Sequence, residues 1–170
     1  MNREPRSQLQ RDCIDRMVKC KSPKLTIEVK PGVGKTFMAL YTISLIGKKP
    51  LIIAPTANLK NQWIENFTEL GIDENDIAKR IYDAPQKKLC VVTISAIENE
   101  LRDDWKGLMD VLQEANFGIR IVDEAHLHLK GLLKFDAICN IKRNYYLSAT
   151  LGRSDDAEDR VLNRALSDIA

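Results

Sequence analysis

The sequence predicts an α/β domain built on a mainly parallel β-sheet that is flanked by helices. Short apolar runs rich in β-branched and aromatic residues alternate with longer stretches whose apolar residues recur at helical spacing. Several runs are almost continuously apolar, which is typical of strands covered on both faces. Strands that alternate with helices favour βαβ units with right-handed crossovers. No repeat, low-complexity tract or long linker is visible, so residues 1–170 are expected to form one domain.

The predicted elements follow from these two patterns. Apolar runs predict strands at 24–29, 50–54, 89–94, 119–122 and 144–149. Helical spacing predicts helices at about 6–20, 35–47, 57–70, 104–115, 131–140 and 155–168. In sheets of this kind, ligands bind beyond the carboxyl ends of the strands. Functional residues are therefore expected directly after the strands.

Composition argues against a membrane protein and is neutral on nucleic acid. The chain is 44% hydrophobic and 29% charged, with a net charge of +2, as is ordinary for soluble globular proteins. Its apolar runs fall short of the roughly 20 residues that span a bilayer, and residues 1–10 lack a signal peptide's apolar segment. We expect a cytoplasmic protein. Residues 1–50 carry 11 basic and 4 acidic side chains, which suits phosphates without being diagnostic of them.

The cysteines predict no metal or disulfide chemistry. They show no CxxC spacing and occur within apolar segments. Reduced, buried thiols are therefore expected rather than zinc ligands or disulfides. The four are Cys13, Cys20, Cys90 and Cys139.

A glycine-rich loop follows the first predicted strand, in the segment KPGVGKT at 30–36. Two glycines allow the loop to turn its backbone N–H groups toward one anion, and the helix that follows presents its positive end. Lys35 supplies a charge for the outer phosphates of ATP and Thr36 a hydroxyl for Mg²⁺. The first position of the P-loop pattern is Val29 instead of glycine, and a plain turn with a surface lysine is the alternative. The predicted nucleotide-binding residues are Pro31, Gly32, Val33, Gly34, Lys35 and Thr36.

Two adjacent carboxylates, Asp123 and Glu124, end the predicted strand 119–122. A P-loop that holds MgATP needs one carboxylate to fix the metal and a base that orients the attacking water. Strand alternation aims neighbouring side chains in different directions, so Asp123 and Glu124 can divide these roles. An ordinary surface turn is the alternative, which the P-loop disfavours.

The chain resembles the superfamily 2 helicases. The resemblance is carried over residues 5–155 by the order of Gln10, KPGVGKT, APT (54–56), TIS (93–95), DEAH (123–126) and SAT (148–150). DEAH-box-like DNA translocases are most similar, including restriction-enzyme motor subunits and phage recombination helicases. The resemblance implies a RecA-like fold, ATP and Mg²⁺ as cofactors, and ATP-driven movement on nucleic acid, with DNA favoured over RNA, in recombination, repair or replication in a bacterial or phage-infected cell.

The resemblance also assigns roles to individual residues. Gln10 is the counterpart of the glutamine that reads adenine, although Ser7 replaces the usual arginine, and Gln8 or a merely solvated residue are alternatives. Trp63 could stack a base, but its helical spacing from Leu59 and Phe67 favours a place in the core. Backbone contacts to nucleic acid are implied for Pro55, Thr56, Thr93 and Ser95. Thr56 is also expected to cap the helix that follows it. Coupling of nucleotide to nucleic acid is implied for His126, Ser148, Ala149 and Thr150.

The second half of the family's motor has no counterpart here. Arg153, Arg160 and Arg164 follow SAT, but nothing resembles the second RecA-like domain, which supplies arginine fingers. We therefore expect the chain to be the first half of a motor, with a second RecA-like domain in a longer parent or a separate chain. Two alternatives are a P-loop ATPase that remodels another substrate and a nucleotide- or nucleic-acid-binding module without turnover.

Overall fold

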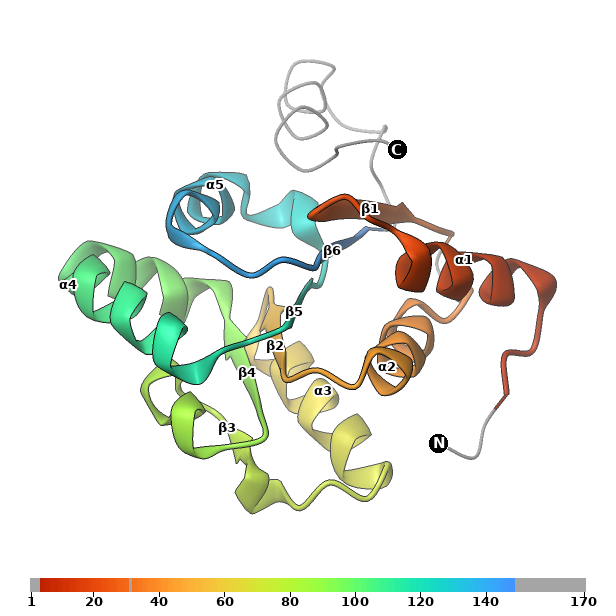
Figure 1. Ribbon diagram of the computed structural model, residues 1–170, viewed down its shortest axis with the longest axis horizontal. Coiled ribbons are helices and arrows are strands. Elements are labelled where there is room, and N and C mark those ends of the chain that lie inside the picture. The colour runs from red at the N-terminus through yellow and green to blue at the C-terminus, as the bar shows by residue number, and fades with distance from the viewer. Residues whose placement is uncertain (1–3, 31, 149–170) are drawn as a thin grey trace.

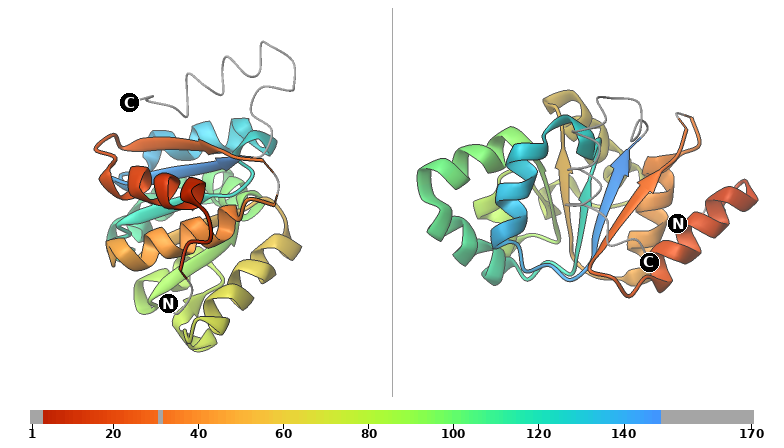
Figure 2. Two further views of the ribbon diagram at one scale, coloured as in Figure 1. Left: turned by 90° about the vertical axis from the view of Figure 1, so that its right-hand side faces the viewer. Right: turned by 90° about the horizontal axis from the view of Figure 1, so that it is seen from above.

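Six parallel strands form one sheet in the computed structural model, which describes residues 4–30 and 32–148 (Figure 1). The strands are β1 (Lys24–Glu28), β2 (Pro50–Ala54), β3 (Ile77–Ala78), β4 (Leu89–Thr93), β5 (Ile119–Val122) and β6 (Asn144–Ser148). Their order across the sheet is β1-β6-β5-β2-β4-β3. The strand arrows point the same way (Figure 2), so the carboxyl ends share one edge. The predicted parallel α/β fold is confirmed.

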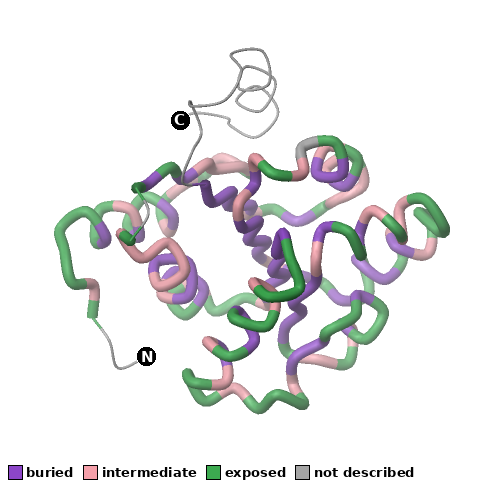
Figure 3. The backbone as a smooth tube through the Cα atoms, turned by 180° about the vertical axis from the view of Figure 1, so that it is seen from behind, coloured by how far each residue is buried: buried purple, intermediate pink, exposed green. Residues whose placement is uncertain are grey.

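Helices cover both faces of the sheet. They are α1 (Gln8–Lys19), α2 (Lys35–Ile46), α3 (Ala57–Glu69), α4 (Ile94–Ala115) and α5 (Leu129–Ile138). One face is packed by α1, α2 and α3, through Met17, Met38 and Trp63 among others. The other is packed by α4 and α5, through residues that include Leu112 and Phe135. Because both faces are covered, strands β2 to β6 are almost entirely buried between the two helical layers, whereas β1 at the edge of the sheet is mostly half-buried (Figure 3).

Helix α4 begins ten residues earlier than predicted. Its backbone breaks at Asp104 (φ −155°, ψ 71°), whose Oδ1 accepts a hydrogen bond from the Gly107 N–H at 3.0 Å. The predicted start at 104 is thus an internal cap between two helical halves. The first half carries apolar residues at helical spacing, Ile94, Ile97 and Leu101, which the sequence prediction overlooked.

Short elements between β2 and α5 were also missed. Strand β3 has two residues, too few to show any alternation. The 3₁₀ helices η1 (Glu74–Asp76), η2 (Ile81–Gln86) and η3 (Ala125–Leu127) are similarly brief. The other helices lie within two residues of their predicted bounds, apart from the predicted helix 155–168, which lies outside the described residues.

Two further expectations concern the cysteines and membrane insertion. All four cysteines are free, but only Cys90 is buried, and the other three are half-buried. Cys20 and Cys139 follow the last residues of α1 and α5, whereas Cys13 lies in the middle of α1, so the expectation of buried thiols is wrong for these three. Within 4–30 and 32–148, the helices are too short or too polar to cross a bilayer.

Candidate nucleotide and nucleic-acid site

The glycine-rich loop joins β1 to α2 at the carboxyl edge of the sheet. Gly32 (φ +86°) and Gly34 (φ +92°) adopt left-handed backbone conformations that favour glycine. Gly34 caps α2 without a side-chain hydrogen bond, so the first N–H groups of the helix remain available for an anion. Thr36 lies half-buried in the first turn of α2. Pro31 lies outside the described residues.

Val29 occupies the position where the P-loop pattern has glycine. Its side chain is buried in the core formed with α1 and α2. Its N–H donates to the carbonyl of Ser148 at 3.3 Å, which extends the pairing of β1 with β6 by one residue. Val29, which departs from the P-loop pattern, therefore extends strand β1, and the turn of the loop begins after Val29.

Lys35 and Glu124 form an ion pair across the site. The Lys35 Nζ lies 2.8 Å from Glu124 Oε1, and both side chains are mostly buried. Glu124 holds a left-handed conformation (φ 47°, ψ 51°) between β5 and η3. Such a backbone costs a non-glycine residue about 1–3 kcal/mol and recurs at functional sites. The strained turn directs the carboxylate to the P-loop lysine.

Asp123 faces a different partner. Its Oδ2 accepts a hydrogen bond from the indole N–H of Trp63 at 3.0 Å, and its N–H donates to the Ile53 carbonyl at 2.9 Å. Burial raises the pKa of Asp123 above its ordinary value, and nearby Glu124 adds to this, whereas the Trp63 hydrogen bond and Lys35 oppose it. The two adjacent carboxylates have different partners, and the left-handed turn at Glu124 sets this divergence, because β5 already ends at Val122.

His126 and Ser148 connect the DEAH segment to the end of β6. The Ser148 Oγ and the His126 Nδ1 are 2.8 Å apart, and the same nitrogen lies 3.6 Å from Glu124 Oε2. Because the Ser148 carbonyl also accepts from Val29, this serine contacts both the support of the P-loop and the DEAH segment. The structure therefore brings together two of the four predicted coupling residues. Ala149 and Thr150 lie outside the described residues.

Gln10 is buried against the P-loop. Its Nε2 donates to the Val33 carbonyl at 2.7 Å, and its Oε1 accepts from the Arg6 N–H at 2.8 Å. The alternative of a solvated helix residue is therefore wrong for Gln10, whereas it fits Gln8, which is exposed and bonded to Asp12. Ser7 caps α1 by accepting from the Gln10 N–H at 3.2 Å. Gln10 thus contacts the P-loop through Val33, and its expected contact with adenine stays a prediction.

The candidate nucleic-acid residues lie on two neighbouring strand ends. Ala54 of β2 is in register with Thr93 of β4. The hydroxyl of Thr93 caps α4 by accepting from the Ala96 N–H at 3.2 Å, and Thr56 caps α3 through Leu59 at 3.2 Å, as predicted for Thr56. A capping hydroxyl that accepts one bond still has a proton to donate to a phosphate. The remaining two differ in exposure, since Pro55 is buried and Ser95 is exposed in the first turn of α4.

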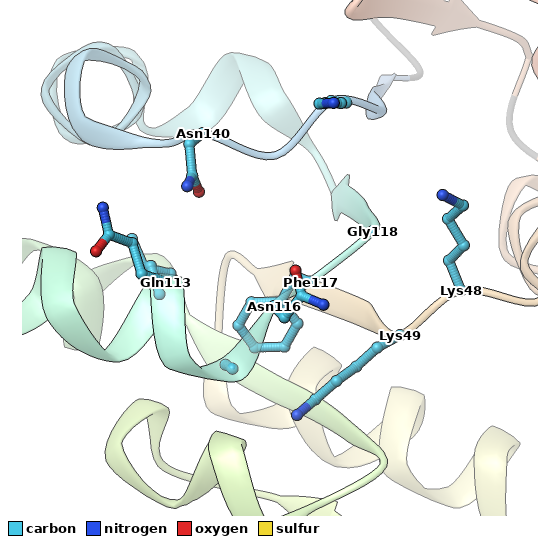
Figure 4. Close-up of a pocket in the computed structure, with 10 residues that line it drawn as sticks. Lys48, Lys49, Gln113, Asn116, Phe117, Gly118 and Asn140 are labelled. Carbon is cyan, nitrogen blue, oxygen red and sulfur yellow. The ribbon is translucent and has the colours of Figure 1, made fainter.

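A cavity of about 570 Å³ lies at the opposite edge of the sheet. It is lined by residues that precede strands, including Lys48 and Lys49 before β2, Phe117 before β5 and Lys142 before β6 (Figure 4). The Lys49 Nζ donates a hydrogen bond to the Ala84 carbonyl at 2.6 Å. None of the predicted site residues lines this cavity, and ligands of parallel α/β sheets bind at the other edge.

One contact at the site was missed by sequence reasoning. Trp63 is buried, as predicted, but it also donates to Asp123. The available signal was chemical, because an indole N–H placed in a core needs an acceptor. The carboxylate that ends β5 is the acceptor it finds.

Comparisons with known proteins identify a family and several similar chains. The family model described as "Type III restriction enzyme, res subunit" matches residues 4–153. The Rad25 protein of Haloarcula marismortui is 27% identical over 132 residues, covering 77% of this chain and 20% of the relative. The DNA 3'-5' helicase XPB of Mycobacterium tuberculosis is 27% identical over 136 residues, with 78% and 24% covered. The chain thus spans a quarter or less of these relatives.

The solved structures support the same fold. The UvsW helicase from bacteriophage T4 superposes with a TM-score of 0.72 at 17% identity, covering 94% of this chain and 57% of that one. The resemblance to superfamily 2 helicases and the RecA-like fold expected from the motif order are thereby confirmed. Because the family model covers most of the sequence, the chain belongs to the family of the type III restriction enzyme res subunit.

Proposed function

We propose that the chain is the first RecA-like, ATP-binding domain of an ATP-dependent DNA helicase or translocase. The observation that carries the proposal is the arrangement of Lys35, Glu124 and Asp123 at one sheet edge. A cation, a base and a metal-binding carboxylate are the parts that phosphoryl transfer from ATP requires. Membership of a family that includes helicase relatives supports the same activity.

The residues divide the work of binding nucleotide. The backbone of the loop 30–34 and the first turn of α2 hold the phosphates. Lys35 exchanges its ion pair with Glu124 for a contact with the outer phosphates. The donors for Mg²⁺ are the Thr36 hydroxyl and the Asp123 carboxylate. These hard oxygen donors fit Mg²⁺. Burial raises the pKa of Asp123, and a nearby cation stabilises its charged carboxylate. Bound MgATP supplies the phosphoanhydride bond and the metal's charge.

Glu124 is the proposed general base. Once Lys35 turns to phosphate, the carboxylate of Glu124 is free to accept a proton from water and orient it. His126 lies next to Glu124, so a movement of the Glu124 carboxylate changes the contact of His126. Ser148 connects His126 to β6. Pro31 and Gln10 remain proposed nucleotide contacts. Ala149 and Thr150 complete the proposed coupling segment.

Nucleic acid is proposed to lie across the ends of β2 and β4. The hydroxyls of Thr56 and Thr93, with Pro55 and Ser95 beside them, offer contacts to a phosphate backbone and none to base edges. Curated relatives carry the names of both DNA and RNA helicases. We propose DNA as the substrate, in recombination, repair or replication, on the resemblance to DNA translocases.

A second RecA-like domain is proposed to complete the motor. It would supply the arginine that stabilises the transition state, from a longer parent or from a separate chain. Steady-state ATP hydrolysis by the complete motor, with single-stranded DNA and a matched RNA, tests the proposal. DNA should stimulate hydrolysis more than RNA does. Absence of ATP hydrolysis under both conditions would refute the motor function, and stimulation by RNA alone would refute the choice of DNA.

A further inference from the structure

Trp63 occupies the middle of α3 and contacts the reaction centre as well as the core. Its side chain is 2% exposed, and its ring packs against Phe67 with centroids 6.4 Å apart. An apolar residue of similar size would serve this packing. The indole adds an N–H donor, and that donor binds Asp123 Oδ2 at 3.0 Å.

The contact restricts the carboxylate that is proposed to hold Mg²⁺. A buried indole has two side-chain torsions, and the close packing of a protein core leaves it little freedom to move. Trp63 holds Oδ2 of Asp123, and the Ile53 carbonyl holds its backbone N–H, so the residue is fixed at its backbone and at one carboxylate oxygen. The orientation of the Asp123 carboxylate is therefore set partly from α3.

The same helix begins at the proposed nucleic-acid site. Thr56 caps α3, and Trp63 lies seven residues later, which is about 10 Å along a helix that rises about 1.5 Å per residue. Pro55, immediately before the cap, lines the same narrow cleft as Asp123 and Glu124. A backbone phosphate that moves the start of α3 would move the indole with it, because the helix is continuous between them.

We propose that Trp63 is a positioning residue that couples nucleic-acid binding at the start of α3 to the metal-binding carboxylate of Asp123. The proposal rests on the proposed function of the site. It adds a second route to the one through His126 and Ser148, because it acts on the neighbouring carboxylate from the opposite side. Trp63 need not touch nucleotide, metal or nucleic acid.

Binding measurements on the 170-residue chain test the coupling. A fluorescent ATP analogue is titrated at increasing Mg²⁺, with and without a saturating thymidine oligonucleotide. Trp63→Phe keeps an aromatic ring in the core and removes the N–H donor. It should raise the Mg²⁺ concentration at half-maximal binding about tenfold, as expected for losing a hydrogen bond to a charged group. It should also abolish the shift that the oligonucleotide causes in the wild type.

Two control variants distinguish loss of the Trp63–Asp123 hydrogen bond from a general loss of fold stability. Phe67→Leu disturbs the same packing without removing the donor to Asp123, and Trp105→Phe removes an exposed indole on α4. Both should keep the wild-type Mg²⁺ midpoint and oligonucleotide shift. Binding measured in EDTA should be equal in all variants. A wild-type midpoint and shift in Trp63→Phe would overturn the inference, as would the same midpoint change in Phe67→Leu.

Fluorescence provides a readout that does not depend on Trp63→Phe folding. In Trp105→Phe, Trp63 is the only tryptophan of the chain. Its emission should change when the Mg²⁺-bound analogue binds, and again when the oligonucleotide is added. Emission that stays constant while both ligands bind would overturn the inference and leave the proposed function intact. If the wild type binds no MgATP analogue, the proposed function itself fails.

Discussion

Lys35 Nζ lies 2.8 Å from Glu124 Oε1, so the P-loop cation and the proposed catalytic base neutralise each other. Both side chains are mostly buried, which strengthens their attraction relative to a surface pair. Nucleotide phosphates compete with Glu124 for the lysine. Binding of ATP is therefore expected to release the carboxylate where the attacking water must be held.

Lys35→Ala should weaken binding of MgATP. The variant removes a charge-assisted contact worth about 1.5–3 kcal/mol, or roughly 10- to 100-fold in affinity. It also leaves Glu124 without its cation, facing the phosphates. Titration with a fluorescent ATP analogue measures the effect. Lys48→Ala, at the far edge of the sheet, is the matched control and should bind as the wild type does. Equal affinities for both variants would remove the P-loop interpretation.

Glu124→Gln should retain nucleotide binding and lose turnover. The amide cannot act as a base, and loss of the ion pair frees Lys35 for phosphate. Affinity for the analogue should therefore equal or exceed that of the wild type, while any measurable hydrolysis disappears. Glu114→Gln, which changes an exposed carboxylate on α4, should alter neither quantity. Hydrolysis at the wild-type rate in Glu124→Gln would rule out its role as base.

The chain should bind single-stranded DNA weakly and without sequence preference. The basic side chains within residues 1–50 and the hydroxyls of Thr56 and Thr93 offer contacts to the phosphate backbone, on one part of a larger nucleic-acid-binding surface. Affinity should fall steeply with salt, because bound phosphates release counterions. Fluorescence anisotropy of labelled oligonucleotides between low and physiological salt measures this. Tight binding to one sequence that persists in high salt would be incompatible with the proposed contacts.

Asp136→Asn should destabilise the fold through a buried ion pair. Arg120 of β5 is fully buried, and its Nη2 lies 2.6 Å from Asp136 Oδ1 of α5. The pair contact is close but poorly aligned for hydrogen bonding, whereas Arg120 bonds well to Asn144 and Tyr146. Removing one partner of a buried pair costs about 3–5 kcal/mol.

Urea unfolding measures that cost. Asp103→Asn, which breaks an exposed contact with Arg102, is the control and should change stability by less than about 1 kcal/mol. A similarly small effect of Asp136→Asn would show that Tyr146 and Asn144 satisfy Arg120 without the carboxylate.

Local sequence patterns were sufficient for the main elements and for the order of the motifs. The apolar runs became β1, β2, β4, β5 and β6, and the glycine loop and DEAH segment lie at the expected edge. The contacts that depend on packing between distant segments were not predictable in this way. Trp63 and Asp123 are 60 residues apart, and their bond exists because α3 packs against β2 and β4, beside the end of β5.

Other misses have local causes. The first half of α4 was overlooked because Thr93 and Ser95 were interpreted as part of a strand end, although Thr93 is a helix cap. The motif around Gln10 left Gln8 or a solvated residue as alternatives, yet Gln10 is buried because α1 packs on α2 next to Val33. Arg120 lies in the predicted strand 119–122, and its partners come from α5 and β6, which a local pattern does not reveal.

The rate of ATP hydrolysis by the isolated chain tests the central claim most directly. Two main catalytic parts, the metal-fixing Asp123 and the base Glu124, are proposed to lie in this chain, whereas the arginine finger is proposed to come from a second RecA-like domain. An arginine finger contributes about 10³- to 10⁵-fold in related phosphoryl transfers. Residues 1–170 should therefore bind MgATP but hydrolyse it extremely slowly, with little stimulation by DNA. Brisk, DNA-stimulated hydrolysis by these residues alone would contradict the half-motor account and indicate a finger in the chain itself, with Arg153 as the first residue to test, or in a second copy.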